Sequence, residues 1–365
     1  MTTTTAPHVP PFCPNPGCRF HHGPRELWHF ERNGFFSRLH APHRVQRFRC
    51  CHCRRHFSTQ TFAVTYWLKQ PRLLPQVFHA LLGCSAFRQI ARRHRISPST
   101  VLTHAARLGR HCLLFHQLHR PAALPEPVVL DGFQSFEFSQ YFPTWFHVVV
   151  GAASHFFYGF TDSELRRSGR MTARQKRRRA ALEARLGRPD PRSIERDVAH
   201  LLELLAPRPQ TVTLHSDDHA DYPRALRRLP HLDVTHHVTP GAAPRTPHNP
   251  LFPVNLLDLL IRHCGANHKR ETIAFSKRRQ SACDRLWSLL VWRNYLKSFS
   301  ERRRDASPAM RLGLADRRLD LAEVLRHRLF PSQVALPERW RGYYRREIPT
   351  RCIPRPAAHR LRFAF

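Results

Sequence analysis

The chain has 365 residues, 41% of them hydrophobic and 25 of them Phe, so it can form folded cores and general disorder is excluded. The 60 Lys and Arg outnumber the 26 Asp and Glu to give a net charge of +34, which favours a polyanionic partner, with nucleic acid as the first candidate. The sequence shows no apolar run of about 18 residues and no signal peptide, so we expect no membrane association and a cytoplasmic location.

Two pairs of cysteines open the chain. Cys13 and Cys18 form the first pair (CPNPGC), and Cys50 and Cys53 form the second (C-x2-C). Four thiolates on two tight turns fit tetrahedral Zn²⁺, and a segment as small as residues 1–65 would need the ion to fold. We therefore predict a structural zinc ribbon in a reducing compartment. Other possible ligands lie nearby: Cys51, His21, His22 and His52.

Residues 66–120 are predicted to form a helical DNA-binding unit. The helical pattern breaks at Ile96, and Ser97 and Pro98 then suit the N-cap and the first position of a new helix. This arrangement predicts a helix-turn-helix, and an ordinary helical hairpin with a solvated basic face is the alternative. The second helix would present a set of residues on its exposed face: Ser99, Thr100, Thr103 and Arg107.

A proline-rich linker at residues 121–127 precedes a change to strand-like patterns. The runs VVLDGFQSFEF, TWFHVVVGAAS and HFFYGFTDS predict an antiparallel meander. A basic insertion at about residues 163–193 is either a solvated helix or an arm that follows DNA. The pattern then gives helix, strand, helix, strand and helix. This is the order of a ribonuclease H-like fold of the α/β class, with a mixed five-stranded sheet and flanking helices, expected over residues 128–300.

Two of the predicted strands end in a carboxylate. PVVLDGF ends its apolar part at Asp131, and TVTLHSDD ends at Asp217. Adjacent carboxylates repel each other unless a cation or a proton separates them, so two such strand ends predict a divalent-metal site. The alternative for Asp217 is that it only caps the following helix. No chemistry can be assigned to the basic extension, residues 301–365.

Several motifs, in this order along one chain, resemble bacterial insertion-sequence transposases with a zinc ribbon, a helix-turn-helix and a ribonuclease H-like DDE core. The motifs are the cysteine pairs ending in RCCHCRRHFS, LDGF, HSDDHADYPRAL, and NHKRETIAFSKRRQ with WRNYLKS behind it. The resemblance covers residues 13–304. It implies that Asp131 and Asp217 are the first two acids of the site. Asp217 is preferred over Asp218, which would face the next helix.

The third acid departs from the family pattern. The position of the family glutamate falls on Asn255, an amide that can donate an oxygen to a metal but brings no charge. Asp258 lies three residues further on, so it shares a helical face with Asn255, and we choose it as the third acid. Glu271 is the other candidate, but it lies beyond the expected helix end at Gly265, where an ion pair is its expected role.

The resemblance implies a DNA transposase that binds terminal inverted repeats and target DNA as a homodimer or higher oligomer in the bacterial nucleoid. Asp131, Asp217 and Asp258 would hold two Mg²⁺ or Mn²⁺ ions for DNA cleavage and strand transfer. The alternative is a catalytically inactive or domesticated, repressor-like DNA-binding protein, and a nuclease for structured RNA is a third class. Basic residues near the last core helix are expected to contact DNA phosphates: Arg262, Lys269, Arg270, Lys277, Arg278 and Arg279.

Overall fold

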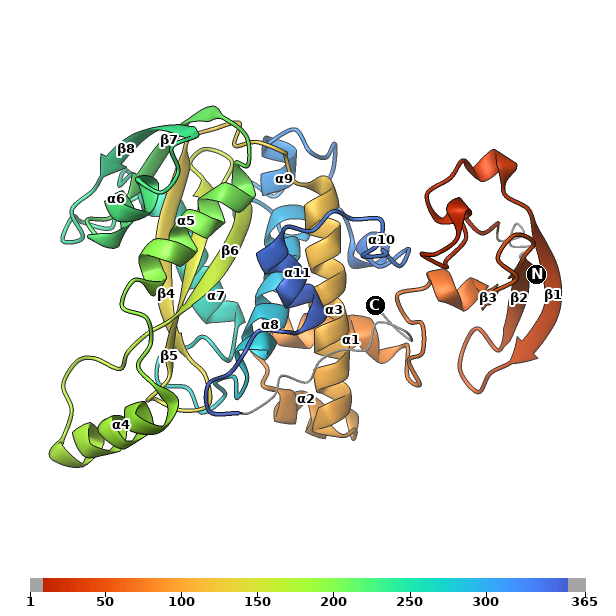
Figure 1. Cartoon of the computed structure of the whole chain (residues 1–365), viewed down its shortest axis with the longest axis horizontal. Coiled ribbons are helices and arrows are strands. Elements are labelled where there is room, and N and C mark those ends of the chain that lie inside the picture. The colour runs from red at the N-terminus through yellow and green to blue at the C-terminus, as the bar shows by residue number, and fades with distance from the viewer. Residues whose placement is uncertain (1–8, 354–365) are drawn as a thin grey trace.

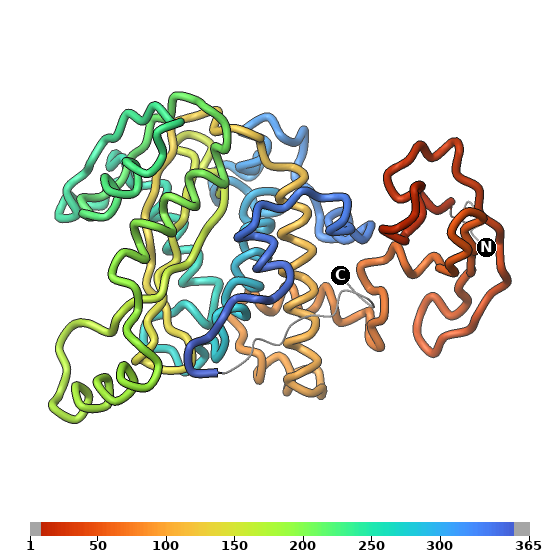
Figure 2. The backbone as a smooth tube through the Cα atoms, in the orientation of Figure 1, coloured from red at the N-terminus to blue at the C-terminus, as the bar shows by residue number. Residues whose placement is uncertain are grey.

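A computed structural model describes residues 9–353 of the chain (Figure 1). The outer ends of the predicted zinc ribbon and of the C-terminal extension, residues 1–8 and 354–365, lie outside the described residues. A small N-terminal module lies at one end of the molecule, beside a larger body built on a five-stranded sheet (Figures 1 and 2). Within residues 9–353, no helix is long and apolar enough to cross a membrane.

The N-terminal module, which we call the ribbon, is an antiparallel sheet with strand order β1-β2-β3. Its strands are β1 (Phe30–Ser37), β2 (Arg44–Cys50) and β3 (His56–Ser58). Three 3₁₀ turns flank them: Arg19–His21, Arg25–Leu27 and Thr59–Phe62. Its core consists of cysteines and aromatic rings, with Phe57 stacked on both Trp28 and Phe48. So small a core buries little apolar surface, which makes an additional cross-link necessary for stability.

The body is built on a mixed sheet with strand order β6-β5-β4-β7-β8. The strands are β4 (Val128–Phe136), β5 (Pro143–Gly151), β6 (Phe157–Glu164), β7 (Gln210–Ser216) and β8 (Leu232–Val238). β4, β5 and β6 form an antiparallel meander, whereas β7 pairs parallel with both β4 and β8. The predicted mixed five-stranded sheet is therefore confirmed, and the small N-terminal antiparallel sheet is compatible with the predicted zinc ribbon.

Helices cover both faces of this sheet. The flanking helices are α5 (Ser193–Leu205), α6 (Asp221–Leu226) and α7 (Phe252–Cys264). On β6, Thr161 and Ser163 donate hydrogen bonds to α5, which places α5 on the face of these residues. On β4, Phe133 lies under the guanidinium of Arg262 of α7. The strand register puts Phe133 and Thr161 on opposite faces, so α5 and α7 enclose the sheet between them.

The basic insertion forms α4 (Ala173–Leu186), a helix that projects from the body (Figure 1). Its first turn is capped by Thr172, whose hydroxyl accepts the N–H of Gln175. None of the residues of α4 is buried. An ion pair between Arg166 and Glu183 at 2.8 Å ties the helix to the segment that leads into it. The insertion is thus a solvated helix.

The predicted break between two helices is confirmed. The segment contains α1 (Leu73–Leu82), α2 (Phe87–His94) and α3 (Pro98–His119). The Ser97 hydroxyl accepts the N–H of Ser99 at 3.2 Å, and Pro98 starts the helix, where its missing N–H costs nothing. α1 and α2 both pack on α3, and most of α3 is buried.

α3 runs along α8 (Arg279–Val291), and the two backbones approach very closely. A Cβ on Gly109 of α3 would overlap the backbone of Asp284 on α8, so only glycine fits at this crossing. α8 continues into a π-helical turn, Trp292–Leu296. The close contact fixes α1, α2 and α3 to the body.

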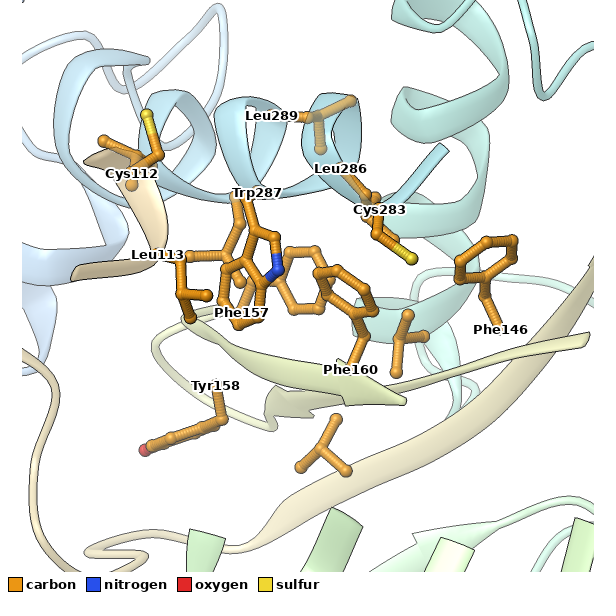
Figure 3. Packing of buried hydrophobic residues seen from close by; sticks show 14 of the residues in the cluster. Cys112, Leu113, Phe146, Phe157, Tyr158, Phe160, Cys283, Leu286, Trp287 and Leu289 are labelled. Carbon is orange, nitrogen blue, oxygen red and sulfur yellow. The ribbon is translucent and has the colours of Figure 1, made fainter. Parts of the chain in front are cut away.

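One apolar core joins the sheet, α3 and α8 (Figure 3), and residues of the C-terminal extension belong to the same core. Trp287 of α8 packs against Phe160 of β6, with ring centroids 4.6 Å apart, and against Trp340 at 5.1 Å. The C-terminal extension, for which no chemistry was predicted, contributes three short helices. They are α9 (Pro308–Arg311), α10 (Leu321–Val324) and α11 (Glu338–Arg345).

Arg279 is the centre of a buried ion-pair network. Its side chain is only 4% exposed and its guanidinium contacts Glu137 at 2.8 Å, Asp162 at 3.1 Å and Glu164 at 2.6 Å. Burial acts to raise the pKa of Asp162, but Arg339 and Arg279 outweigh it and hold the pKa below its ordinary value. The network ties the start of α8 to the meander. The expectation that Arg279 contacts DNA is therefore wrong, because carboxylates surround its guanidinium.

We expect Arg279→Met to lower the free energy of unfolding by about 3–5 kcal/mol, because three carboxylates would be left without their shared cation in the interior. Denaturant unfolding of the full chain measures the change. Lys277→Met is the matched control, since Lys277 is exposed and should change stability by less than about 0.5 kcal/mol. A loss below about 1 kcal/mol for Arg279→Met would show that the network is not structural.

Candidate metal centres and nucleic-acid interface

The four predicted zinc ligands lie together in the ribbon. Cys13, Cys18, Cys50 and Cys53 have sulfur atoms within 4.8 Å of one another, and the Cys13 and Cys53 sulfurs are 3.6 Å apart. Backbone turns present each pair: the Cys18 N–H donates to the carbonyl of Asn15, and the second pair occupies the turn between β2 and β3. Four converging thiols with this spacing fit a tetrahedral Zn²⁺, so zinc would cross-link the two turns.

Burial raises the pKa of Cys13 and Cys18, whereas the surroundings of Cys50 favour its thiolate. Burial acts to raise the pKa of Cys50, but N–H groups of Cys53, Trp28 and His52 outweigh it and lower the pKa to about 7. The Trp28 indole donates to the Cys50 sulfur at 3.2 Å, a hydrogen bond that holds the thiolate in place. Of the other possible ligands, His21 is committed elsewhere, because its ring bonds the carbonyl of Cys13 and the hydroxyl of Ser332.

We expect the purified chain to contain about one zinc per molecule, held by the four thiols. Cys50→Ser should lose most of it, whereas Cys51→Ser should retain it, because Cys51 is a neighbour that does not belong to the four-thiol group. Elemental analysis of the purified variants measures the content. Full zinc in Cys50→Ser, or its loss in Cys51→Ser, would contradict this assignment.

The register between β4 and β7 brings two of the predicted acids together. These strands pair in parallel at Val128 with Leu214 and at Val129 with His215. Continued by two residues, the same register sets Asp131 opposite Asp217, on strands that are about 4.8 Å apart. The Asp217 charge contributes to raising the pKa of Asp131, after burial, which is the larger cause; the pKa reaches about 6. The two carboxylates therefore lie near each other, one on the inner strand β4 and the other just after the neighbouring strand β7.

Helix α7 carries the third predicted carboxylate, Asp258, on the face of the sheet that Asp131 shares. Asp258 lies one helical turn before Arg262, whose guanidinium is over Phe133, and Asp131 lies two residues before Phe133 on the same face of β4. Burial, and then the charge of Asp131, raise the pKa of Asp258 to about 8. Within residues 9–353, the Asp258 Oδ1 atom is buried and accepts no hydrogen bond. A buried oxygen without a partner suits a metal ligand.

These carboxylates offer hard oxygen donors of the kind that Mg²⁺ and Mn²⁺ bind. The oxygen atoms of these carboxylates lie farther apart than the sulfur atoms of the thiols. Within residues 9–353, the four cysteines are the group of possible ligands whose ligand atoms all lie within 4.8 Å of one another. Tyr222 is buried beside them, and its pKa is raised well above the ordinary value by burial and then by the charges of Asp131, Asp217 and Asp258. The three carboxylates therefore do not enclose one ion position in the way that the four thiols do.

The alternative acids lie in different surroundings. Asp218 is exposed, and its carboxylate lies beside Gly241, in the loop after β8. Glu271 is exposed beyond the end of α7. Asn255 is partly buried on the same helix as Asp258. The alternative that Asp217 caps the following helix is wrong, because the N-cap of α6 is Ala220, without a side-chain cap; the Asp217 Oδ1 accepts the N–H of His219 at 3.1 Å in the turn before this helix.

Two features of the site were not identified from the sequence. Arg245 is exposed in the loop before α7, and its charge acts to lower the pKa of both Asp131 and Asp258. Gly132 follows Asp131, and a side chain there would overlap the Trp145 ring on the other face of the sheet. The Asp-Gly pair in LDGF could have indicated Gly132 as part of the site. For Arg245, the sequence offered no indication beyond its charge.

The residues predicted to contact DNA divide into exposed and buried sets. Ser99 and Thr103 are exposed at the start of α3, and Thr100 is partly exposed. The prediction that Arg107 lies on the exposed face is wrong, because it is 3% exposed and donates to the carbonyls of Val64 and Tyr66. Near α7, exposed or partly exposed cations remain: Arg262, Lys269, Arg270, Lys277 and Arg278.

The exposed cations of α2 were not identified from the sequence as candidate DNA contacts. Arg88, Arg92 and Arg93 are exposed on this helix, and Arg95 is exposed in the turn that follows it. They lie beside Ser99 along the chain, so the basic surface of this segment lies at the α2–α3 turn rather than along α3. The sequence contains these basic residues, but their exposure depends on which face of each helix packs on the body.

We expect Asp258→Asn to raise the free energy of unfolding by roughly 1–3 kcal/mol at pH 8 without added Mg²⁺, because it removes a buried charge whose Oδ1 atom accepts no hydrogen bond within residues 9–353. In the wild type, folded Asp258 keeps its proton up to about pH 8, whereas the unfolded chain releases it near the ordinary value of 3.8. Stability should therefore fall as the pH rises between these values, and the variant should lack this fall.

Thermal and denaturant unfolding of the zinc-loaded chain from pH 5 to 9 measures this effect. Asp218→Asn is the control, because its exposed carboxylate should change stability by less than about 0.5 kcal/mol. If Asp258→Asn is destabilised throughout this range, the carboxylate makes favourable contacts and is not an unpaired ligand.

A comparison with protein-family models finds no match to the chain, and a comparison with curated proteins finds none either. Among solved structures, the chain is similar to one chain in the cryoEM structure of the simian T-cell lymphotropic virus intasome in complex with PP2A regulatory subunit B56 gamma. The identity is 14% and the TM-score is 0.24, over 67% of this chain and 74% of that chain. At this TM-score the likeness supports no conclusion about the fold or function of this chain.

Proposed function

We propose that this chain is a DDE-type DNA transposase of the bacterial insertion-sequence kind, with a ribonuclease H-like core. The main support is the convergence of Asp131, Asp217 and Asp258, which come from β4, the end of β7 and α7. The strand order, with a meander followed by two parallel strands, agrees with the order of elements that favoured this fold. The net charge of +34 adds support for a DNA partner.

The three carboxylates would hold the metal ions of the reaction. When bound, a pair of Mg²⁺ or Mn²⁺ ions activates water or a DNA 3′-hydroxyl and stabilises the charge on the leaving 3′-oxygen. Pairing of β4 with β5 and β7 fixes Asp131, and the N–H of His219 orients Asp217. Asp258, on α7, would supply the third carboxylate ligand. The attacking oxygen bonds to phosphorus as the bond to the 3′-oxygen breaks, so no covalent link to a protein side chain is required.

Exposed cations around this site would hold the DNA backbone. Arg245 acts to lower the pKa of both Asp131 and Asp258, and Lys269 and Arg270 follow α7. Phosphate contacts of this kind give affinity and position the duplex rather than read its sequence. Ser99 and Thr103, at the start of α3, would contact the groove of an element end. Because two ends must be joined, the working form would be a dimer or a higher oligomer.

A non-catalytic, repressor-like DNA-binding protein is the second candidate function. The amide of Asn255 favours it, because Asn255 occupies the place where the resemblance expects a glutamate. An amide oxygen can contact a metal but leaves the site with less charge for holding two divalent ions. In this function the zinc module and the basic surface would still be used, whereas the three carboxylates would not.

We expect Asp131→Asn and Asp217→Asn each to lower DNA cleavage and strand transfer by at least about 100-fold, because loss of a metal ligand removes several kcal/mol of transition-state stabilisation. Duplex binding should persist. The assay uses the full chain, Mg²⁺ or Mn²⁺, and duplexes that carry the genomic sequences flanking the reading frame. Cleavage, joining to a plasmid and gel-shift binding are measured in parallel.

Asp218→Asn is the matched control, because Asp218 is the adjacent but exposed carboxylate and should keep full activity. Unchanged cleavage by Asp131→Asn and Asp217→Asn would show that the proposed site does not act. If the wild type binds these duplexes but cleaves none of them with either metal, the repressor-like function is the correct one.

A further inference from the structure

A large cleft separates the ribbon from the body. Its volume is about 1700 Å³. Residues of the ribbon strands and their turns form one wall, and the other consists of residues 60–69, residues 328–336 and α11. Small-molecule sites usually measure about 300–1,000 Å³, so this cleft has room for a larger ligand. It is lined by none of the three carboxylates of the candidate catalytic site.

The two walls are joined by specific contacts. The Gln333 side chain donates to the carbonyl of His21, and the His21 ring bonds the Ser332 hydroxyl at 2.7 Å. Phe330 of the body packs into the small core of the ribbon. These contacts hold the ribbon against the body, so the cleft is a built feature of the described structure.

The lining carries cations without acids. It includes seven Arg and Lys residues and no Asp or Glu. Exposed cations come from both walls: Arg47 and Arg55 from the ribbon, Lys69 from the connecting segment, and Arg341 and Arg345 from α11. Like charges that face each other across a cleft repel unless an anion lies between them. The cleft therefore suits a polyanion.

An exposed indole lies among these cations. Trp67 lines the cleft and is 65% exposed. Its backbone has φ +61, a left-handed conformation that is rare for a bulky side chain. Strain of this kind gathers at functional sites, where the rest of the structure maintains it. An exposed aromatic face among Arg and Lys side chains is the combination that binds unpaired nucleobases together with their phosphates.

We propose that this cleft binds single-stranded nucleic acid, with the backbone phosphates on Arg47, Arg55, Lys69, Arg341 and Arg345 and an unpaired base stacked on Trp67. A duplex offers the same phosphates but keeps its bases within the stack, so Trp67 favours the single strand. This binding site is separate from the proposed catalytic site, and it goes beyond the proposed function because it requires no metal on Asp131, Asp217 or Asp258.

The test measures binding of a fluorescein-labelled, mixed-sequence 20-nucleotide DNA single strand and the matching duplex to the full chain, by anisotropy, without added Mg²⁺. We expect Trp67→Ala to weaken single-strand binding by about 5- to 150-fold, and Trp67→Phe to retain most of the affinity, because stacking on one base contributes about 1–3 kcal/mol. Duplex affinity should change less than about twofold in both variants, because only the unpaired base contacts Trp67.

A charge variant tests the same cleft independently of Trp67. Arg55→Ala combined with Arg345→Ala should reduce the slope of log affinity against log salt by about 1.4 for the single strand, since each phosphate contact contributes about 0.7. Arg302→Ala combined with Arg303→Ala is the matched control, because these exposed arginines do not line the cleft and should leave the slope unchanged.

Zinc content and circular dichroism establish that each variant is folded, and the charge variant decides the question if Trp67→Ala does not fold. Unchanged single-strand affinity in folded Trp67→Ala, or an equal loss for the duplex, would overturn the proposal. An unchanged salt slope in the charge variant would overturn it as well. Because no cleavage is measured, an inactive catalytic site would leave these outcomes unaffected.

Discussion

Parallel pairing of β4 with β7 is the constraint on which the candidate catalytic site depends. It pairs Val128 and Val129 with Leu214 and His215, and Asp131 and Asp217 each follow two residues after the last of these pairs. The chain keeps two carboxylates close together at a partly buried edge, with Asp258 and Tyr222 beside them. Such an arrangement opposes folding unless a cation or protons offset the repulsion. Carboxylates with raised pKa values of this kind make the site a candidate for function.

The rest of the body holds this sheet rigid. α8 packs against β6 through Trp287 and against α3 at Gly109, where the two backbones are nearly in contact. The Arg279 network then links α8 to the end of the meander. Since α3 is largely buried, the helices that the sequence indicated as a DNA-binding unit share the core of the body. A duplex held at the start of α3 would therefore have a fixed orientation relative to the carboxylates.

The positive charge of the chain is unevenly distributed. Several carboxylates form ion pairs within the body. Glu137 and Asp162 pair with Arg279 in the interior, and Glu183 of α4 pairs with Arg166 close to its own helix. The cleft beside the ribbon has none in its lining, while it has seven cations. Net charge alone therefore says that the chain prefers a polyanion, whereas the arrangement of the acids decides where the polyanion can lie.

The sequence by itself determined the features that depend on neighbouring residues. The spacing of the cysteine pairs predicted the four-thiol group, Ser97 and Pro98 predicted the start of α3, and alternating and apolar runs predicted the five strands. These signals are local, because turn geometry, helix capping and the period of a strand involve only a few adjacent residues. Asp217 was identified in the same way, since it follows the apolar strand β7, whereas Asp131 was predicted at a strand end but lies within β4, which continues to Phe136.

Only the tertiary structure decided which charged side chains remain exposed. Arg107 and Arg279 looked like their exposed neighbours in the sequence, but each is buried against distant partners, Val64 and Glu137 among them. The tertiary structure likewise distinguished Asp217, whose charge acts on Asp131, from the exposed Asp218. It placed Asp258 where the charge of Asp131 acts on it. It also joined the C-terminal extension to the core through Trp340. The cleft beside the ribbon was not visible in the sequence, because its walls come from opposite ends of the chain. Burial and long-range electrostatics depend on contacts between remote segments, and local sequence patterns do not encode them.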